Sequence, residues 1–150
     1  SKLLIKKGVI SVYIYRKKGP LREFADDHIR ESTIKMSEKQ CMEFSKSMAL
    51  LGKSLSQIKK KITIKEDIPL LEIKAGTYDV QRFLYWNFLK CWWSPDVPFD
   101  QSVATNYDWY FPKFAYRHSE KEITKWFKDI KLKIIHFNEI ESGFSISAKK

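Results

Sequence analysis

The last third of the chain constrains the fold most strongly. Ser119 and Glu122 are spaced as in a capping box, and apolar side chains follow at helical spacing. An apolar run over residues 132–137 and an alternating segment over 144–148 come next, with Gly143 in the short connection between them. Two strands joined by so short a connection must be antiparallel. The sequence therefore predicts a capped helix that leads into a C-terminal β-hairpin.

The first third predicts a strand and two helices. Val9–Tyr15 carries apolar side chains on both faces, which predicts a central, largely buried strand. Pro20 suits the first turn of a helix, which we expect to run to about Lys35 with helical spacing of Leu21, Phe24 and His28. Ser37 begins a second helix through another capping box. The apolar stripe of this second helix consists of Cys41, Phe44, Met48, Leu51, Leu55 and Ile58.

The middle of the chain is rich in aromatic residues. Alternation over residues 62–65 predicts a short extended segment. A further helix is expected from Thr77 or Asp79, with apolar side chains on nearly every face as far as Trp93. Residues 94–107 contain two prolines and are predicted to be a loop.

Composition limits the environment and the partners. The 150 residues carry 28 Lys and Arg against 18 Asp and Glu, a net charge of +10, but the lysines are spread along the sequence and a solvated surface explains them. Nucleic acid is not the expected partner, because no RNA-binding sequence pattern accompanies the charge. No stretch is long and apolar enough to span a bilayer, so no membrane is expected. Cys41 and Cys91 fall in apolar helical patterns and are predicted to be buried free thiols of a cytoplasmic protein.

Four stretches together carry a resemblance to a known family. They are Gly8–Tyr15, Asp79–Asn87 with Lys90 and Cys91, Asp108–Tyr110 with Pro112 and Lys113, and the helix and hairpin of residues 119–150. In this order they resemble the C-terminal half of a class I, Rossmann-like S-adenosylmethionine-dependent methyltransferase of the bacterial small-molecule type. Lys131 departs from the family pattern, which usually has glycine between the last helix and the strand after it.

The resemblance implies an α/β fold. Residues 1–16 and 119–150 would form the C-terminal part of the Rossmann-like domain, as a three-stranded mixed sheet. Its last strand would be central and antiparallel to both neighbours. Residues 17–118 would be a mostly helical, aromatic-rich insertion that covers the substrate. The free edge of Val9–Tyr15 would invite self-association.

The resemblance also implies methyl transfer from S-adenosylmethionine to an unknown, small-molecule acceptor. The chain has no Gly-x-Gly, the pattern that begins a cofactor loop of this type. We therefore expect the N-terminal half of the domain to lie outside this sequence, and we expect this chain alone not to bind the cofactor. The alternative function is a non-enzymatic basic module that binds nucleic acid or a protein partner.

Aromatic and polar residues of the insertion are the candidates for substrate binding, because aromatic rings form flat walls and Asn or Lys can orient a ligand. They are Tyr85, Asn87, Lys90, Trp92, Trp93, Tyr107, Trp109 and Tyr110. The catalytic residue is unknown. His118, just before the capping box, is expected to make a hydrogen bond within its loop, with contact to substrate or a role as a base as the alternative. Asp26, Asp27 and His28 are read as a solvated helix face, with an acid–base or metal cluster as the alternative. No residue is expected to bind a metal.

Overall fold

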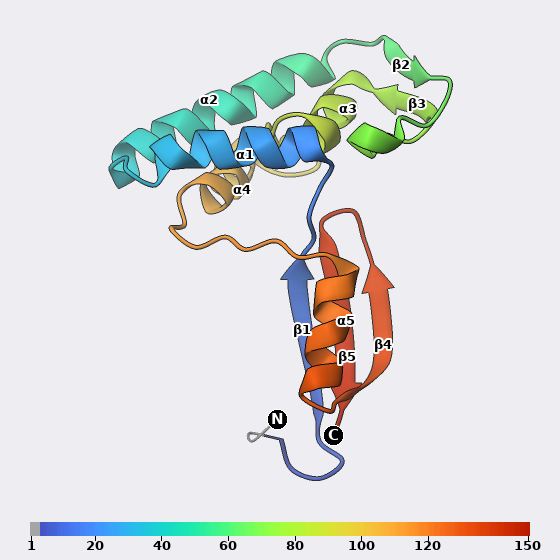
Figure 1. The fold of residues 1–150 in the computed structure, drawn as a ribbon. Helices are drawn as coiled ribbons and strands as arrows, with labels where there is room; N and C mark the ends of the chain where they lie inside the picture. The colour runs from blue at the N-terminus through green and yellow to red at the C-terminus, as the bar shows by residue number, and fades with distance from the viewer. Residues whose placement is uncertain (1–3) are drawn as a thin grey trace. The chain divides into compact units, whose positions relative to one another are not determined.

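The computed structural model describes residues 4–150, which form two compact units (Figure 1). The first unit, here called the sheet unit, comprises residues 4–17 and 116–150. The second, the helical unit, comprises residues 18–115.

The sheet unit contains three strands and one helix. In chain order these are β1 (Val9–Tyr15), α5 (Glu120–Asp129), β4 (Lys133–Glu139) and β5 (Gly143–Lys149). The strand order is β1-β5-β4, and β5 is antiparallel to both neighbours. The prediction that the last strand is central and antiparallel to both is therefore confirmed. The two outer strands run in the same direction on either side of β5.

Helix α5 packs against one face of this sheet. Its capping box is present as predicted: the Ser119 hydroxyl accepts from the Glu122 N–H, and the Glu122 carboxylate accepts from the Ser119 N–H. The buried core between helix and sheet consists of Ile123, Phe127, Leu132, Phe144, Ile146 and Ala148. Lys131, in the turn between α5 and β4, has a φ of 55°, a left-handed conformation that favours glycine.

Strand β1 is an edge strand among residues 4–150, because it pairs with β5 alone. Val9 is 52% exposed and Tyr13 49% exposed, so the prediction of a largely buried strand is wrong for these residues. The side chains that point toward α5, such as Val12 and Ile14, are half-buried. Apolar residues on both faces of β1 are therefore not a sign that this strand is central or buried.

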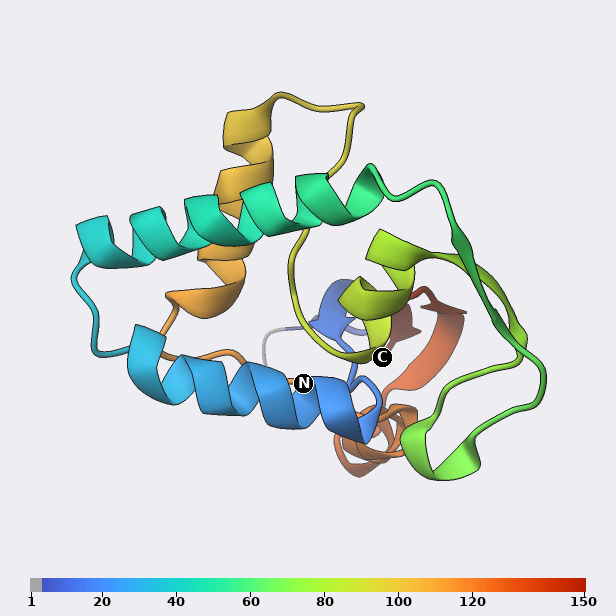
Figure 2. The ribbon, with the colours of Figure 1, turned by 90° about the horizontal axis from the view of Figure 1, so that it is seen from above.

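The helical unit contains four helices and a two-stranded ribbon. The helices are α1 (Pro20–Thr33), α2 (Glu38–Ser56), α3 (Val80–Asn87) and α4 (Phe99–Tyr110). The ribbon pairs β2 (Lys61–Ile64) with β3 (Gly76–Asp79), with the 3-10 helix η1 (Pro69–Leu71) in their connection. Helices α1 and α2 each contact both α3 and α4; in Figure 2 α3 lies between them and α4 crosses α2. The predicted helices at Pro20 and Ser37 and the extended segment at 62–65 are thus confirmed.

Two predictions of secondary structure in this unit are wrong. Most of the segment 94–107 belongs to α4, because its second proline, Pro98, stands immediately before the helix rather than inside it. The helix from Asp79 ends at Asn87 instead of continuing toward Trp93. The segment after it is held by Asn106, whose amide accepts from the Trp92 N–H and donates to the Trp92 carbonyl. These two bonds replace the helical partners that residue 92 would otherwise need.

Candidate functional site

Helix α1 turns its charged side toward the interior of the helical unit. Arg22, Asp26, Arg30 and Thr33 are buried, whereas Phe24 is 73% exposed. The spacing of Leu21, Phe24 and His28 therefore marks the solvent side of this helix, not its packed side. Asp26 is fully buried, so the interpretation of Asp26–His28 as a solvated helix face is wrong for Asp26.

A buried ion pair anchors α1 to α3. The Arg22 Nε donates to Asp26 Oδ2 at 2.9 Å, one helical turn away. The Arg22 Nη1 donates to the Tyr85 carbonyl oxygen of α3. The guanidinium carbon also lies 5.1 Å from the centroid of the Tyr85 ring and 5.6 Å from that of Trp109. Cation–π contacts of this kind strengthen when they are desolvated.

Lys90 lies in the same cluster and is only 7% exposed. Its Nζ is 4.6 Å from the centroid of the Trp109 ring and 3.5 Å from the Tyr85 hydroxyl oxygen. Burial, and after it the positive charge of Arg22, lowers the pKa of Lys90 from 10.5 to about 8, while Asp26 and Asp108 oppose the shift. We call Arg22, Asp26, Tyr85, Lys90 and Trp109 the Lys90 cluster.

The phenol of Tyr85 is shifted in the opposite sense. Burial raises the pKa of Tyr85 to about 12, against the opposing charges of Arg22 and Arg82. Tyr85 is therefore a neutral hydrogen-bonding group at ordinary pH. Of Tyr85 and Lys90, Lys90 has the pKa that lies nearer neutrality.

The end of α4 is held in place by side chains of α1. Arg30 donates to the carbonyls of Trp109 and Pro112, and the Thr33 hydroxyl donates to the Tyr110 carbonyl at 2.7 Å. The Tyr110 hydroxyl in turn donates to the Lys90 carbonyl at 2.9 Å. These bonds hold the main chain at Trp109 and at Lys90, and so they fix the Trp109 ring relative to the Lys90 amine.

The sequence-predicted substrate residues separate into two groups. Those brought together are Tyr85, Lys90, Trp109 and Tyr110. The Asn87 amide instead donates to a carbonyl of its own helix. Trp92 contributes its main chain to Asn106, and the Tyr107 ring stacks on the ring of Phe111 with centroids 4.7 Å apart. Trp93 is half-buried and lies beside Gly52 of α2.

Sequence reasoning missed Arg22 as a member of the cluster. The available signal was the four-residue spacing of Arg22, Asp26 and Arg30, which places three charged side chains on one face of a helix. A row of this kind is usually solvated. Nothing local distinguishes it from a buried row, because the carbonyl groups that receive the arginines belong to residues more than sixty positions later.

His118 belongs to the sheet unit. Its N–H donates to the Tyr15 carbonyl, and its own carbonyl accepts from the Lys17 N–H. Its ring meets the Trp126 ring edge to face, with centroids 4.4 Å apart. The main chain of His118 thus makes the hydrogen bonds of this loop, while its ring packs on α5.

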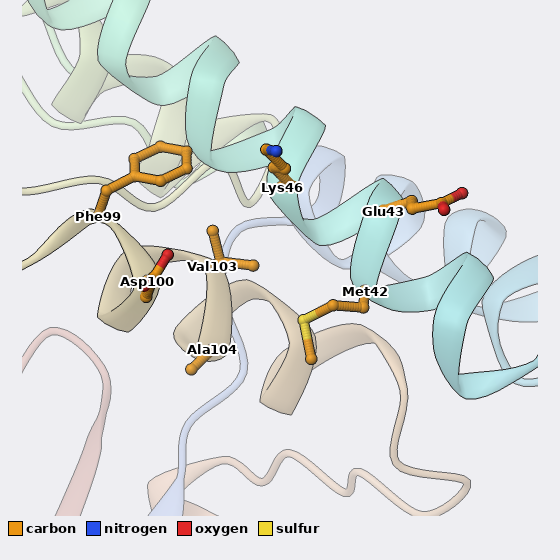
Figure 3. Close-up of a pocket in the computed structure, with 7 residues that line it drawn as sticks. All are labelled: Met42, Glu43, Lys46, Phe99, Asp100, Val103 and Ala104. Carbon is orange, nitrogen blue, oxygen red and sulfur yellow. The ribbon is translucent and has the colours of Figure 1, made fainter.

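A groove of about 440 Å³ lies between α2 and α4 (Figure 3). Its size falls in the range of small-ligand sites. It is lined by Met42, Glu43, Lys46, Phe99, Asp100, Val103 and Ala104. None of the predicted substrate residues and no member of the Lys90 cluster lines it.

The cysteines are buried free thiols, as predicted. Burial raises the pKa of Cys91 to about 11, so this thiol is a poor metal ligand and a poor nucleophile. Across residues 4–150, no group of three or more His, Cys, Asp or Glu side chains is placed to hold a metal ion. No helix in the same range is both long enough and apolar enough to cross a membrane.

Comparison with known proteins gives no relative. No family model, no curated protein and no solved structure matches this chain.

Proposed function

We propose that this chain is the acceptor-binding, C-terminal part of a Rossmann-like S-adenosylmethionine-dependent methyltransferase in the cytoplasm. The observation that carries the proposal is the strand order β1-β5-β4, with β5 antiparallel to both neighbours. The methyltransferase family that the sequence resembles ends its sheet with the same order. The chain passes from β1 through the helical unit and α5 to β4, and the later strand β5 lies between β1 and β4. This path is unusual for a small isolated sheet, because consecutive strands more often lie side by side.

The helical unit would then bind the acceptor. It is inserted between β1 and α5, and its interior holds aromatic rings beside an amine. Tyr85 and Trp109 supply flat apolar walls, and Lys90 supplies a charge or a proton acceptor for orientation.

The cofactor would be held by residues outside this chain. The five glycines are Gly8, Gly19, Gly52, Gly76 and Gly143, and each lies in a different part of the fold. They do not fit a glycine-rich cofactor loop, in which successive glycines let the backbone approach the ligand. We therefore assign acceptor binding and the covering of the active site to residues 1–150, and we assign them no contact with the cofactor.

The test compares two lengths of the protein. Residues 1–150 alone, and the same residues joined to the sequence encoded directly before Ser1, are titrated with S-adenosylmethionine by calorimetry. The longer protein is expected to bind and to transfer a labelled methyl group, and the shorter one is expected not to bind. An upstream sequence without a glycine-rich strand–loop–helix, or a longer protein that binds no S-adenosylmethionine, would refute the proposal.

A further inference from the structure

The positive charge of the chain is concentrated in the sheet unit. Residues 1–17 and 116–150 carry 13 Lys and Arg against 5 Asp and Glu, a net charge of +8. Residues 18–115 carry 15 against 13, a net charge of +2. The even spread of lysines along the sequence thus hides an uneven spread over the two units.

Within the sheet unit, lysines gather at one end, where β1 and β4 begin and α5 and β5 end (Figure 1). We call this the lysine end. Its exposed lysines are Lys6, Lys7, Lys128, Lys131, Lys133, Lys149 and Lys150. Asp129 is the single acidic residue in the segments that supply them, residues 5–9, 128–133 and 148–150. The lysine end is therefore almost purely cationic.

The strand register brings like charges together at this end. Lys133 of β4 lies directly opposite Lys149 of β5. Directly opposed side chains are about 5 Å apart at Cβ, and like charges in such a pair destabilise the sheet. The Lys150 Nζ donates to the Leu4 carbonyl, so a further ammonium group is held against the segment that precedes β1. A bound polyanion would relieve this repulsion.

The apolar residues at the lysine end indicate which polyanion fits. Ile5 is 80% exposed, Val9 52% and Ile130 45%. Ile5 and Ile130 each stand next to a lysine in the sequence, and Val9 lies opposite Lys149 in the sheet. The three segments contain no arginine and no aromatic residue. Proteins that bind single-stranded nucleic acid use aromatic stacking, and arginine is favoured for nucleic-acid recognition. Lysines with exposed aliphatic side chains instead suit a lipid surface, where the ammonium groups meet anionic headgroups and the aliphatic groups enter the interface.

We propose that the lysine end docks this protein on the surface of a membrane rich in anionic phospholipids. The lysines bind the headgroups, and Ile5 and Ile130 enter the boundary between headgroups and acyl chains. The docking is peripheral, reversible and sensitive to salt, because the charges are exposed and screened by ions. The proposal does not depend on methyl transfer.

The test measures co-sedimentation with vesicles of phosphatidylcholine, either pure or with about 30 mol% phosphatidylserine. The protein is expected to bind the anionic vesicles only, and to bind less as salt rises from about 0.1 M to about 0.3 M. Each lysine near such a surface contributes about fivefold to partitioning. The lysine-end variant, which should therefore bind at least a hundredfold less, carries Lys131→Gln, Lys133→Gln, Lys149→Gln and Lys150→Gln.

A matched control removes the same charge from the helical unit. It carries Lys59→Gln, Lys60→Gln, Lys61→Gln and Lys65→Gln, all at exposed positions. This control is expected to bind vesicles nearly as well as the original protein. The uncharged double change Ile5→Ser and Ile130→Ser should weaken binding severalfold without altering its salt dependence. Circular dichroism checks that each variant is folded.

Three results would overturn the proposal. The first is the absence of binding to anionic vesicles at low salt. The second is an equal loss of binding in the control and in the lysine-end variant, which would mean that overall charge decides. The third is tighter binding, at equal salt, to a single-stranded or duplex oligonucleotide than to the vesicles, which would make nucleic acid the partner of this surface.

Discussion

Replacement of Lys90 by methionine tests whether its ammonium group destabilises the fold. Lys90 is 7% exposed, and its amine is influenced by Arg22 and Asp26 of α1, by Tyr85 of α3 and by Asp108 of α4. Burial and the charge of Arg22 disfavour the protonated form, and the two carboxylates favour it, with a resulting pKa of about 8 against 10.5. Methionine keeps the length of the side chain and removes the charge.

The direction in which the free energy of unfolding changes with pH follows from the number of protons that the folded and unfolded states bind. Between pH 8 and 10.5 the unfolded chain keeps the Lys90 proton that the folded chain has lost, so the contribution of this group to stability rises with pH in that window. Below pH 8 both states are protonated and the full cost of about 3 kcal/mol is present, at 1.36 kcal/mol for each pKa unit. Lys90→Met should therefore raise the free energy of unfolding, relative to the original protein, by the largest amount near pH 7. Its advantage should shrink by about 3 kcal/mol toward pH 10.5.

Urea unfolding of both proteins between pH 7 and pH 10, followed by circular dichroism, measures this difference. Cys91 also titrates in this range: its raised pKa gives stability that is present below pH 9 and is lost as pH rises toward 11. Both proteins share this loss, so it cancels in the difference between them. Lys59→Met, at an exposed position, is the control and should show no pH-dependent difference. A Lys90→Met difference that stays constant from pH 7 to pH 10 would show that the amine is not desolvated as described.

Two further predictions concern single backbone positions. Gly52→Ala should destabilise the helical unit by about 1–3 kcal/mol, because the new Cβ would overlap the Cys91 carbonyl, whereas Ser54→Ala on the exposed side of the same helix should have little effect. Urea midpoints of the two variants would contradict this reasoning if they were equal. Lys131→Gly should stabilise the protein by about 1 kcal/mol, because a left-handed φ of 55° suits glycine, and Lys128→Gly inside α5 should destabilise it by a similar amount. Thermal unfolding of this pair must show shifts of opposite sign if the turn is as described.

Local signals made much of the sheet unit predictable. A capping box, an amphipathic helix and a tight connection between two alternating segments each depend on residues within a few positions of one another. The position of β5 between β1 and β4 came from the resemblance to a family, since periodicity cannot order strands that lie far apart in the sequence. The exposure of β1 could not be read from its apolar residues, because burial depends on what lies beside a strand and not on the strand itself.

The helical unit was less predictable because distant residues decide its local structure. Asn106 of α4 holds the main chain of Trp92, and this pairing ends the helical pattern that the aromatic sequence after Asp79 suggested. Pro98 favoured the prediction of a loop, although proline is also common at the start of a helix. Of the predicted substrate residues, Tyr85, Trp109 and Tyr110, whose carbonyls accept from α1, came together with Lys90. Asn87 binds its own helix and Trp92 binds Asn106, and neither joins them.

The buried side chains of Arg22, Arg30 and Thr33 on α1 share one role, because they donate hydrogen bonds to carbonyl groups at the ends of other helices. The last carbonyls of a helix have no partner within that helix. Arg22 donates to the Tyr85 carbonyl near the end of α3, and Arg30 and Thr33 donate to the Trp109 and Tyr110 carbonyls at the end of α4. One row of side chains on α1 thus satisfies the ends of two other helices, where positive charge is also favoured by the helix dipole. The rings of Tyr85 and Trp109 both lie near the Arg22 guanidinium, with centroids 5.1 and 5.6 Å from its carbon. The residues of α1 that cap α3 and α4 therefore also assemble the Lys90 cluster.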